Sequence, residues 1–236
     1  YSANGPMYAG ERNWEPTGPL VMELETDMLT IAVEPRRFLP NADDSEGTGF
    51  EGHEFFEGSS MRQWDGTYYF IYSSVKNAEL CYAKSKYPDR DFVYGGTVVH
   101  IADVGLDGRT YEQGTNMTGN THGSIEKIKD DYYVFYHRQT NRTDYSRQGC
   151  AEKVYRDENG NFPQVEVTSC GLNNADLFGE GKYPAYICCH LRGKKGITYS
   201  GYEEMKDEYP YLTQDIPDIN PEHPLAKTDA DTPVQH

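Results

Sequence analysis

The sequence of 236 residues lacks any run of 18 apolar residues, so it contains no candidate membrane-spanning helix. It is also poor in basic residues, because 22 Lys and Arg stand against 38 Asp and Glu, for a formal net charge of −16. Such a charge repels phosphate backbones and anionic membrane surfaces, so neither nucleic acid nor a membrane is an expected partner. A neutral polysaccharide meets no such repulsion. The plainer alternative is that the acidity only keeps the protein soluble.

Cysteine is scarce, with five residues at Cys81, Cys150, Cys170, Cys188 and Cys189. An odd number that includes an adjacent pair and no C-x-x-C spacing predicts neither a zinc site nor a disulfide framework. The odd count favours a reducing, cytoplasmic compartment, although a secreted bacterial protein stays an alternative. The sequence indicates no oligomeric state.

Helical periodicity is almost absent, whereas tyrosine is abundant, with 20 Tyr beside 9 Phe and 2 Trp. Tyrosine favours half-buried strands, and its ring and hydroxyl suit contacts with sugars. The 23 Gly and 13 Pro supply many turn positions. We therefore expect an all-β fold of short strands joined by loops.

A repeat of about 64 residues organises the middle of the chain. Residues 57–72 and 121–136 align on a Tyr-Tyr pair in each copy, and each copy has the pattern of strand, tight turn and strand. The turns are predicted at Asp65-Gly66 and Asp130-Asp131. Each copy is therefore expected to form a β-hairpin.

Further strands are expected after each hairpin, at residues 80–85 and 149–154, with edge strands at 92–94 and 165–167. Four antiparallel strands per repeat are typical of a β-propeller blade, and propellers have about four to eight blades. Residues 20–24 match the third strand of an earlier blade, so the sequence opens within a blade and continues through about two more. We therefore expect part of a propeller, truncated at both ends.

Two ionisable residues fall at nearly matching positions of the repeat. The first strand of each propeller blade lines the central channel, so residues that begin these strands converge on the axis. Glu57 begins one such strand, and His122 lies within one residue of the equivalent place in the next copy. Both are therefore expected to face one pocket. Aromatic neighbours at Phe55 and Phe56 favour a general acid at Glu57 over an ordinary solvated carboxylate.

Other polar residues nearby are less specific. Glu51 and Glu54 precede Glu57 in an approach loop, where contact with substrate or solvent is expected rather than the acid role. Arg147 lies beside the third strand of the second copy, where it is expected to hold a sugar or to form an ordinary salt bridge. His122 suits a structural role or contact with a water or a metal ion, but no second ligand at a fixed spacing implies a metal cage.

The motifs around Glu57 and His122 resemble those of glycoside hydrolase family 43, the five-bladed β-propeller xylosidases and arabinofuranosidases. The similar segments are Phe56–Arg62, Gly119–Ile125, Tyr132–Arg138, Ser146–Glu152 and Pro163–Thr168. The resemblance covers most of residues 1–190. It implies five blades, of which this chain would hold the later ones.

The resemblance implies a glycosidase that cleaves side chains or oligosaccharides of plant cell-wall polysaccharides such as xylan, with inversion at the anomeric carbon. Glu57 would protonate the leaving oxygen while an Asp about 6.5–9.5 Å away activates water. In the family this base and a second Asp, which tunes the acid, belong to the first two blades. No residue of this sequence matches either, so both are expected upstream, and this stretch alone is expected to be inactive.

The resemblance also assigns roles to the remaining positions. Arg147 is expected to hold the substrate, and Phe50, His53 and Asn120 to bind it as well. His122 would contact a calcium ion at the propeller axis through water. Hydrolysis itself requires no cofactor, so this calcium ion would be structural.

The chain is expected to divide into two parts. Residues 1–190 would form the partial catalytic propeller, and residues 191–236 a linker or extended segment, because Pro and Asp become frequent there. The segment Tyr209–Asp215 resembles the entry to an accessory β-sandwich that some relatives carry, which would lie beyond His236.

Three alternatives remain open on the sequence alone. A propeller without the base would bind carbohydrate without cleaving it. A propeller can also serve as a scaffold for protein contacts. Among enzymes, the five-bladed furanosidases that act on fructans are the nearest alternative, and they retain the anomeric configuration.

Overall fold

The computed structural model describes residues 18–116, 118–139, 147–168 and 171–173. These residues form antiparallel strands and a few short 3₁₀ segments, which confirms the expected all-β class. No helix in the described ranges is long and apolar enough to cross a membrane. The strands are β1 (Leu20–Leu24), β2 (Ile31–Arg37), β3 (Phe55–Trp64), β4 (Thr67–Ser74), β5 (Glu79–Ser85), β6 (Val93–His100), β7 (Gly123–Ile128), β8 (Asp131–Gln139) and β9 (Arg147–Val154). The 3₁₀ segments are η2 (Leu106–Gly108), η3 (Tyr111–Gln113) and η4 (Gly171–Asn173).

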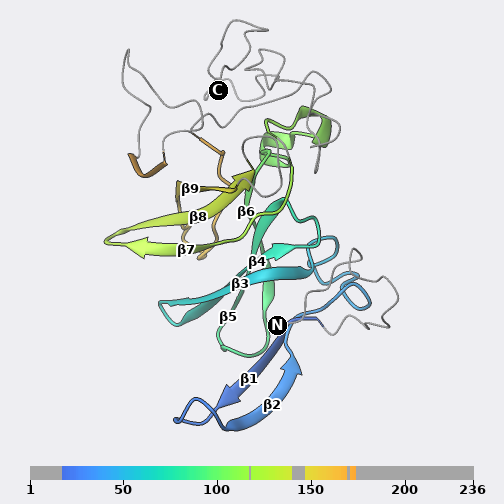
Figure 1. Cartoon of the computed structure of the whole chain (residues 1–236), viewed down its shortest axis with the longest axis vertical. Helices are drawn as coiled ribbons and strands as arrows, with labels where there is room; N and C mark the ends of the chain where they lie inside the picture. Colours follow the sequence, from blue (N-terminus) through green and yellow to red (C-terminus); the bar gives the residue numbers. More distant parts are fainter. Residues whose placement is uncertain (1–17, 117, 140–146, 169–170, 174–236) are drawn as a thin grey trace, which may run out of the picture.

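The strands form three sheets that follow the order of the chain. β1 pairs with β2, β3 to β6 form a four-stranded meander, and β7 to β9 form a three-stranded meander. Figure 1 shows the β1–β2 pair at one end of the molecule, the four-stranded sheet in the middle and the three-stranded sheet beyond it. Each sheet contains only neighbours in sequence, as expected of blades.

Both hairpins of the repeat close with two-residue turns. In the first, Asp65 and Gly66 have φ values of 50° and 71°, as a tight hairpin turn with left-handed residues requires. In the second, Ile128 pairs with Asp131, so the turn consists of Lys129 and Asp130. The prediction of an Asp130-Asp131 turn is therefore wrong by one residue. The 64-residue offset itself aligns Lys129 with Asp65.

The four-stranded sheet is buried on both faces because its central strands alternate between two hydrophobic clusters. Phe70, Tyr72 and Cys81 belong to one cluster, which includes Leu39 and Phe55. The intervening residues of β4 and β5 belong to a second, larger cluster, here called the inter-sheet core. Its members are Tyr69, Ile71, Ala78, Leu80, Tyr82, Val98, Val99, Ile101, Ile125, Val134, Tyr136, Val154, Phe162 and Val167.

The inter-sheet core joins the four-stranded sheet to the three-stranded sheet. Ile71 and Leu80 from the former and Ile125 and Val134 from the latter are all fully buried. Burying one such side chain contributes about 1.5–3 kcal/mol, so this contact is a major source of stability. It fixes the position of β7 against β3 and β4, which also touch directly.

One predicted strand is wrong. Residues 165–167 do not pair with β9 and form no strand. Instead the Val165 N–H donates to the carbonyl of Val98 in β6 (2.9 Å), and the Val167 N–H donates to a carboxylate oxygen of Asp103 (2.9 Å). Val167 is also fully buried in the inter-sheet core, so these two hydrogen bonds and burial, rather than pairing with β9, place this segment. The other edge strand is longer than predicted, since β6 runs from Val93 to His100.

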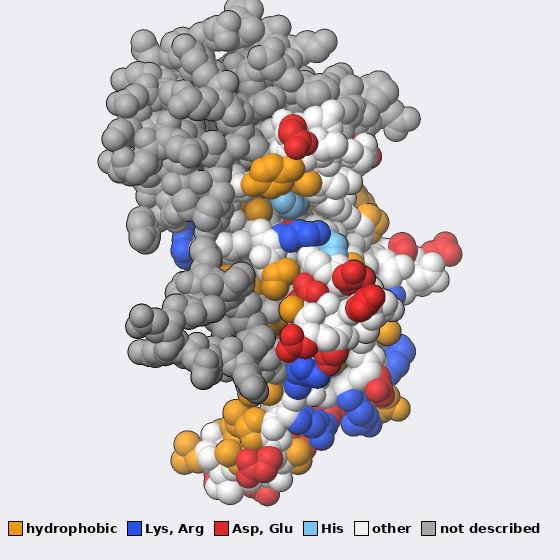
Figure 2. Space-filling model, turned by 90° about the vertical axis from the view of Figure 1, so that its right-hand side faces the viewer, with side chains coloured by type: hydrophobic (Ala, Val, Ile, Leu, Met, Phe, Trp, Pro, Cys, Tyr) orange, Lys and Arg blue, Asp and Glu red, His pale blue; other side chains and the backbone are white. Residues whose placement is uncertain are grey.

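The strand predicted at residues 20–24 is confirmed as β1, which pairs with an unpredicted strand, β2. This pair is mostly exposed, and Figure 2 shows hydrophobic side chains at its end of the molecule. Met28 and Leu29 at its turn are 70% and 86% exposed. An ion pair between Arg36 and Asp89 ties the pair to the four-stranded sheet. The linker predicted at residues 191–236 and the boundary between the two predicted domains lie outside the described residues.

One buried carboxyl in the three-stranded sheet is tied to the stability of the fold. Glu152 in β9 is 5% exposed and accepts hydrogen bonds from the Tyr136 hydroxyl and from the N–H and hydroxyl of Thr168. Burial raises the pKa of Glu152 to about 7, although those hydrogen bonds oppose the rise. The negative charge of Asp103 adds to it.

Replacing Glu152 with Gln is expected to flatten the pH dependence of stability. Between the ordinary pKa of 4.5 and about 7, the folded protein holds a proton that the unfolded chain has released, so stability falls as pH rises through this range. The loss amounts to at most about 3 kcal/mol. Urea unfolding of the protein and of Glu152→Gln at pH 4.5–8 measures it, and the variant should gain relative stability with pH. Parallel profiles would contradict this.

Candidate active site

Glu57 lies at the irregular start of β3. The pairing of β3 with β4 shifts between Phe55 and Glu57 and again between Glu57 and Ser60. Gly58, within this stretch, has a φ of 68°, which glycine adopts without strain. Bulges of this kind re-aim side chains at the ends of strands. The Glu57 side chain stays 32% exposed and reaches the neighbouring sheet.

His122 meets Glu57 from that sheet. It directly precedes β7, and its Nε2 lies 2.7 Å from Oε1 of Glu57. The two side chains are similarly exposed, at 36% and 32%. The hydroxyl of Ser73, which pairs with Glu57 in the hairpin, donates to the carbonyl of Thr121. The structure therefore brings together the two residues that the repeat predicted would face one site.

Polar pairs continue this contact along the line where the two sheets meet. The Ser60 and Ser124 hydroxyls are 2.8 Å apart, and Arg62 donates to Glu126 at 3.0 Å. Each pair joins residues 64 positions apart, which is the period of the repeat. Both pairs thus match the register in which the two sheets pack, and Glu57–His122 is the pair nearest the starts of β3 and β7.

The turn between β4 and β5 connects the loops that carry the two residues. The Val75 N–H donates to the carbonyl of Glu54 (3.0 Å), ahead of β3. The Thr121 N–H donates to the carbonyl of Asn77 (3.0 Å), ahead of β7. The β4–β5 turn thus braces the site, because it is hydrogen-bonded both to the segment before β3 and to the segment before β7.

His137 in β8 lies behind His122. The His122 backbone N–H donates to Nδ1 of His137 (3.2 Å), and Nε2 of His137 lies 3.1 Å from Oδ1 of Asn120. These partners require a neutral ring with its proton on Nε2. Burial, aided by the charges of His122 and Arg147, lowers the pKa of His137 to about 4 and keeps it neutral above that pH. Asn120, a predicted substrate ligand, therefore has its oxygen turned to His137.

The approach loop differs from expectation at two residues. Phe50 is 2% exposed in the cluster of Leu39 and Phe55, so its ring is packed inside and offers no face to a sugar. Glu54 is 7% exposed rather than open to solvent. Burial alone would raise the pKa of Glu54, but hydrogen bonds from the Ser45 hydroxyl (2.5 Å) and the Gly52 N–H (3.0 Å) lower it.

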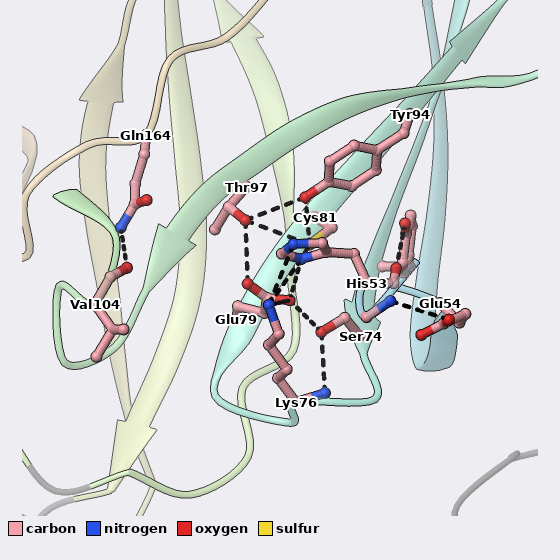
Figure 3. Close-up of polar contacts among 12 residues, drawn as sticks. His53, Glu54, Ser74, Lys76, Glu79, Cys81, Tyr94, Thr97, Val104 and Gln164 are labelled. Atoms are coloured by element: carbon pink, nitrogen blue, oxygen red, sulfur yellow. Dashed lines mark hydrogen bonds and ion pairs between the residues drawn. The ribbon is translucent and has the colours of Figure 1, made fainter. Parts of the chain in front are cut away.

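His53 is fixed by a buried carboxylate (Figure 3). Its Nδ1 lies 2.7 Å from Oε1 of Glu79, and its ring stacks on Tyr94 with centroids 5.0 Å apart. Glu79 also accepts from the hydroxyls of Ser74 (2.5 Å) and Thr97 (3.1 Å). Burial alone would raise the pKa of Glu79, but the hydrogen bonds from His53 and Ser74 lower it to about 2.

The outer edge of His53 faces Lys76. The Lys76 ammonium lies 3.2 Å from Nε2 of His53, and Lys76 stands in the turn that braces the site. The His53 side chain is 26% exposed. The predicted substrate role of His53 stays a prediction, with Lys76 as a cation beside it.

A metal ion could in principle bind at two places, beside His53 and beside His122. His53, Glu79 and Cys81 offer donor atoms within 4.8 Å of one another. The Lys76 ammonium (4.0 Å) and the His53 ring (2.7 Å) already contact that carboxylate, and burial raises the pKa of the Cys81 thiol, so the set does not favour a cation. Around His122, the described residues form no comparable group of ligands. Calcium prefers six to eight oxygen ligands, and the calcium ion that the resemblance implies stays a prediction.

Arg147 begins β9 and is exposed. It pairs with Gln139 at the end of β8, and its charge contributes to the lowered pKa of His137. Arg147 thus lies on the His137 side of the site. Its contact with substrate stays a prediction.

Sequence reasoning missed His137, Glu79 and Lys76. A signal for His137 was available, because extending the pairing of Gly123 with Tyr136 by one residue places His137 opposite His122. For Glu79 the only local signal is a carboxylate at the start of an otherwise apolar strand.

Comparison with models of protein families gives no match. Among curated proteins, a xylosidase/arabinosidase from Thermoclostridium stercorarium is 47% identical over 201 residues, which cover 84% of this chain and 42% of that protein. A second xylosidase/arabinosidase, from Bacteroides ovatus, is 32% identical over 120 residues, which cover 50% of this chain and 32% of that protein. The chain thus spans less than half the length of these relatives.

Among solved structures, a glycoside hydrolase family 43 arabinoxylan arabinofuranohydrolase from Bacillus subtilis, in complex with cellotetraose, is similar with a TM-score of 0.51. The match covers 72% of this chain and 34% of that chain at 20% identity, so it shows the fold alone. These comparisons bear out the resemblance to glycoside hydrolase family 43, since the chain is similar in sequence to part of curated xylosidase/arabinosidases and in fold to part of an enzyme of that family.

Proposed function

We propose that the protein hydrolyses xylosidic or arabinosidic bonds of plant cell-wall polysaccharides or oligosaccharides, and that Glu57 is its general acid. The observation that carries this proposal is the partly exposed Glu57 carboxyl held 2.7 Å from His122 where two sheets meet. The names of the relatives, xylosidase/arabinosidase, support the class of substrate.

The contact with His122 suits the acid role of Glu57. The Nε2–H of His122 donates to Oε1, which leaves Oε2 to carry the acid proton. The glycosidic oxygen accepts that proton as its bond to the anomeric carbon breaks. His122 thus orients the carboxyl without being consumed.

The second carboxylate of the reaction is assigned to no residue of this chain. An inverting mechanism places it about 6.5–9.5 Å from the acid, with the attacking water between them. We propose that an Asp from the earlier blades supplies it. Arg147 and His53 are proposed to contact the sugar from either side of Glu57, and any calcium ion at the axis would be structural.

We also propose that the complete fold is a ring of five blades. The four-stranded meander β3–β6 has the composition of one whole blade, and β7–β9 supply three strands of the next. The β1–β2 pair would be the outer half of the preceding blade. In such a ring, β3 and β7 are innermost and present Glu57 and His122 to the channel.

Replacing Glu57 with Gln in the intact enzyme is expected to lower turnover about 10²–10⁴-fold on aryl glycosides with poor leaving groups. Substrates with good leaving groups need less protonation, so their turnover should fall much less. Steady-state rates across a leaving-group series measure this difference.

Glu126→Gln is the matched control, because it neutralises a carboxylate on the same sheet contact but farther along β7. It should leave turnover unchanged. An unchanged rate for Glu57→Gln would remove Glu57 from the acid role. No hydrolysis by the unmodified intact protein would favour a carbohydrate-binding propeller.

The stereochemistry of hydrolysis gives an independent test. Proton NMR during early turnover of an aryl xyloside by the intact enzyme should show a product of inverted anomeric configuration, because water attacks opposite the leaving group. A product with retained configuration would instead support the mechanism of the fructan-type furanosidases.

Gly58→Ala is expected to lower turnover about tenfold or more, since misplacing a catalytic group by 1 Å can cost about 100-fold. A Cβ at this position would lie 2.8 Å from Cδ2 of His122, so the ring must move away from Glu57. Kinetics and thermal unfolding of the intact enzyme measure the effect.

Gly66→Ala is the matched control. Gly66 has a similar φ of 71°, but a Cβ there meets no atom within 4 Å. Both variants should lose similar stability from backbone strain, and only Gly58→Ala should lose turnover beyond that. Equal turnover in the two variants would contradict the importance of the His122 position.

A further inference from the structure

Three consecutive residues of the loop before β7 are held by a single residue of β8. Asn120 meets the His137 side chain through its Oδ1 (3.1 Å), the Thr121 hydroxyl donates to the His137 carbonyl (2.7 Å), and the His122 N–H donates to His137 Nδ1 (3.2 Å). We call these contacts the His137 clamp. The third of them fixes the backbone of the residue that contacts Glu57.

The clamp lies where the β7–β8 ladder ends. Gly123 with Tyr136 is the last regular pair, and His122 with His137 would be the next. There the side chain of His137, instead of its backbone, receives the His122 N–H. The rings of the two histidines also meet edge to face, with centroids 5.4 Å apart. The loop before β7 thus lies beyond the strand ladder, but the side chain of His137 still binds it to β8.

The residues around the His137 clamp are closely packed and leave His122 little room to move. A Cβ on Gly123 would lie 2.1 Å from the Phe135 carbonyl oxygen, so the backbone approaches β8 closely beside His122. On its other side, the His122 ring is in contact range of Gly58. A shift of the His122 backbone would therefore be transmitted to Glu57.

We propose that His137 is a positioning residue of the active site, which sets the placement of the Glu57 acid by holding the backbone of His122. The inference rests on the proposed function, because it names a residue that supports the same acid. His137 does not contact the reacting atoms. Its effect on catalysis passes through His122 alone.

The two ring nitrogens of His137 make different hydrogen bonds, and substitutions that keep one, the other or neither of them separate their effects. Oδ1 of an Asn at this position can replace Nδ1 as the acceptor for the His122 N–H, but Asn does not reach Asn120. The side-chain nitrogen of a Gln can replace Nε2 as the donor to Asn120, but no acceptor remains for His122. Phe preserves the flat ring and removes both hydrogen bonds.

The test measures kcat and KM of the intact enzyme on aryl glycosides with good and poor leaving groups. His137→Phe and His137→Gln should lower kcat about 10–100-fold on poor leaving groups, with a smaller effect on good ones and little change in KM. His137→Asn should recover turnover to within about threefold of the unmodified enzyme. Glu126→Gln again serves as the control with unchanged turnover.

A double variant distinguishes positioning of the acid from a general structural role. If His137 acts through Glu57, adding His137→Phe to Glu57→Gln should cause almost no further loss of kcat. Full additivity, or equal losses for Asn, Gln and Phe, would overturn the inference.

The outcomes also separate this inference from the proposed function. If Glu57→Gln leaves turnover unchanged, the acid assignment fails whatever His137 does. NMR then tests the clamp without activity, because the His122 amide resonance should shift strongly in His137→Phe and little in His137→Asn. An unshifted resonance in His137→Phe would show that the clamp is absent.

Discussion

The hydrophobic contact between the four-stranded and three-stranded sheets is the constraint on which the candidate site depends. Ile71 and Leu80 pack with Ile125 and Val134 so that neither sheet can slide past the other without opening a buried cavity. The half-buried Ser60–Ser124 and Arg62–Glu126 pairs contribute little stability themselves, but they follow the register that this core imposes. Glu57 and His122 are the next pair toward the starts of β3 and β7. Their contact is therefore a consequence of how the sheets pack.

The parts of the fold that the sequence predicted are those with local causes. Both hairpins follow from alternating Tyr, Phe and Val around two-residue turns. The repeat of 64 residues predicts the same hairpin in each of its two copies. Residues 165–167 have the composition of a strand, but their placement is decided by distant partners, Val98 and Asp103. No local pattern carries that information. The turn at Lys129–Asp130 was misplaced by one residue for a different reason. The prediction followed the two adjacent Asp residues, Asp130 and Asp131, instead of the 64-residue offset, which aligns Lys129 with Asp65.

The candidate site divides in the same way. Glu57 and His122 could be paired from sequence because corresponding positions of adjacent blades converge, and the hairpin register would have added His137. The pairing of His53 with Glu79 joins residues 26 positions apart, beside Tyr94 and Thr97, so it depends on packing. Phe50 was assigned to sugar binding from the resemblance to the family. Its burial could not be inferred without knowing which face of the loop lies on the sheet.

The carboxylates near the start of β3 differ in what surrounds them, and the difference supports Glu57 as the acid. Glu54 and Glu79 are nearly inaccessible, each accepts hydrogen bonds from several donors, and those donors lower their pKa values. A carboxylate stabilised as an anion in this way is a poor proton donor near neutral pH and is out of reach of a substrate. Glu57 differs from both in its accessibility, because its side chain is about one-third exposed while the ring of His122 orients it. The fold thus uses the buried carboxylates of Glu54 and Glu79 to anchor the loop and the turn, and leaves that of Glu57 accessible to a glycosidic oxygen.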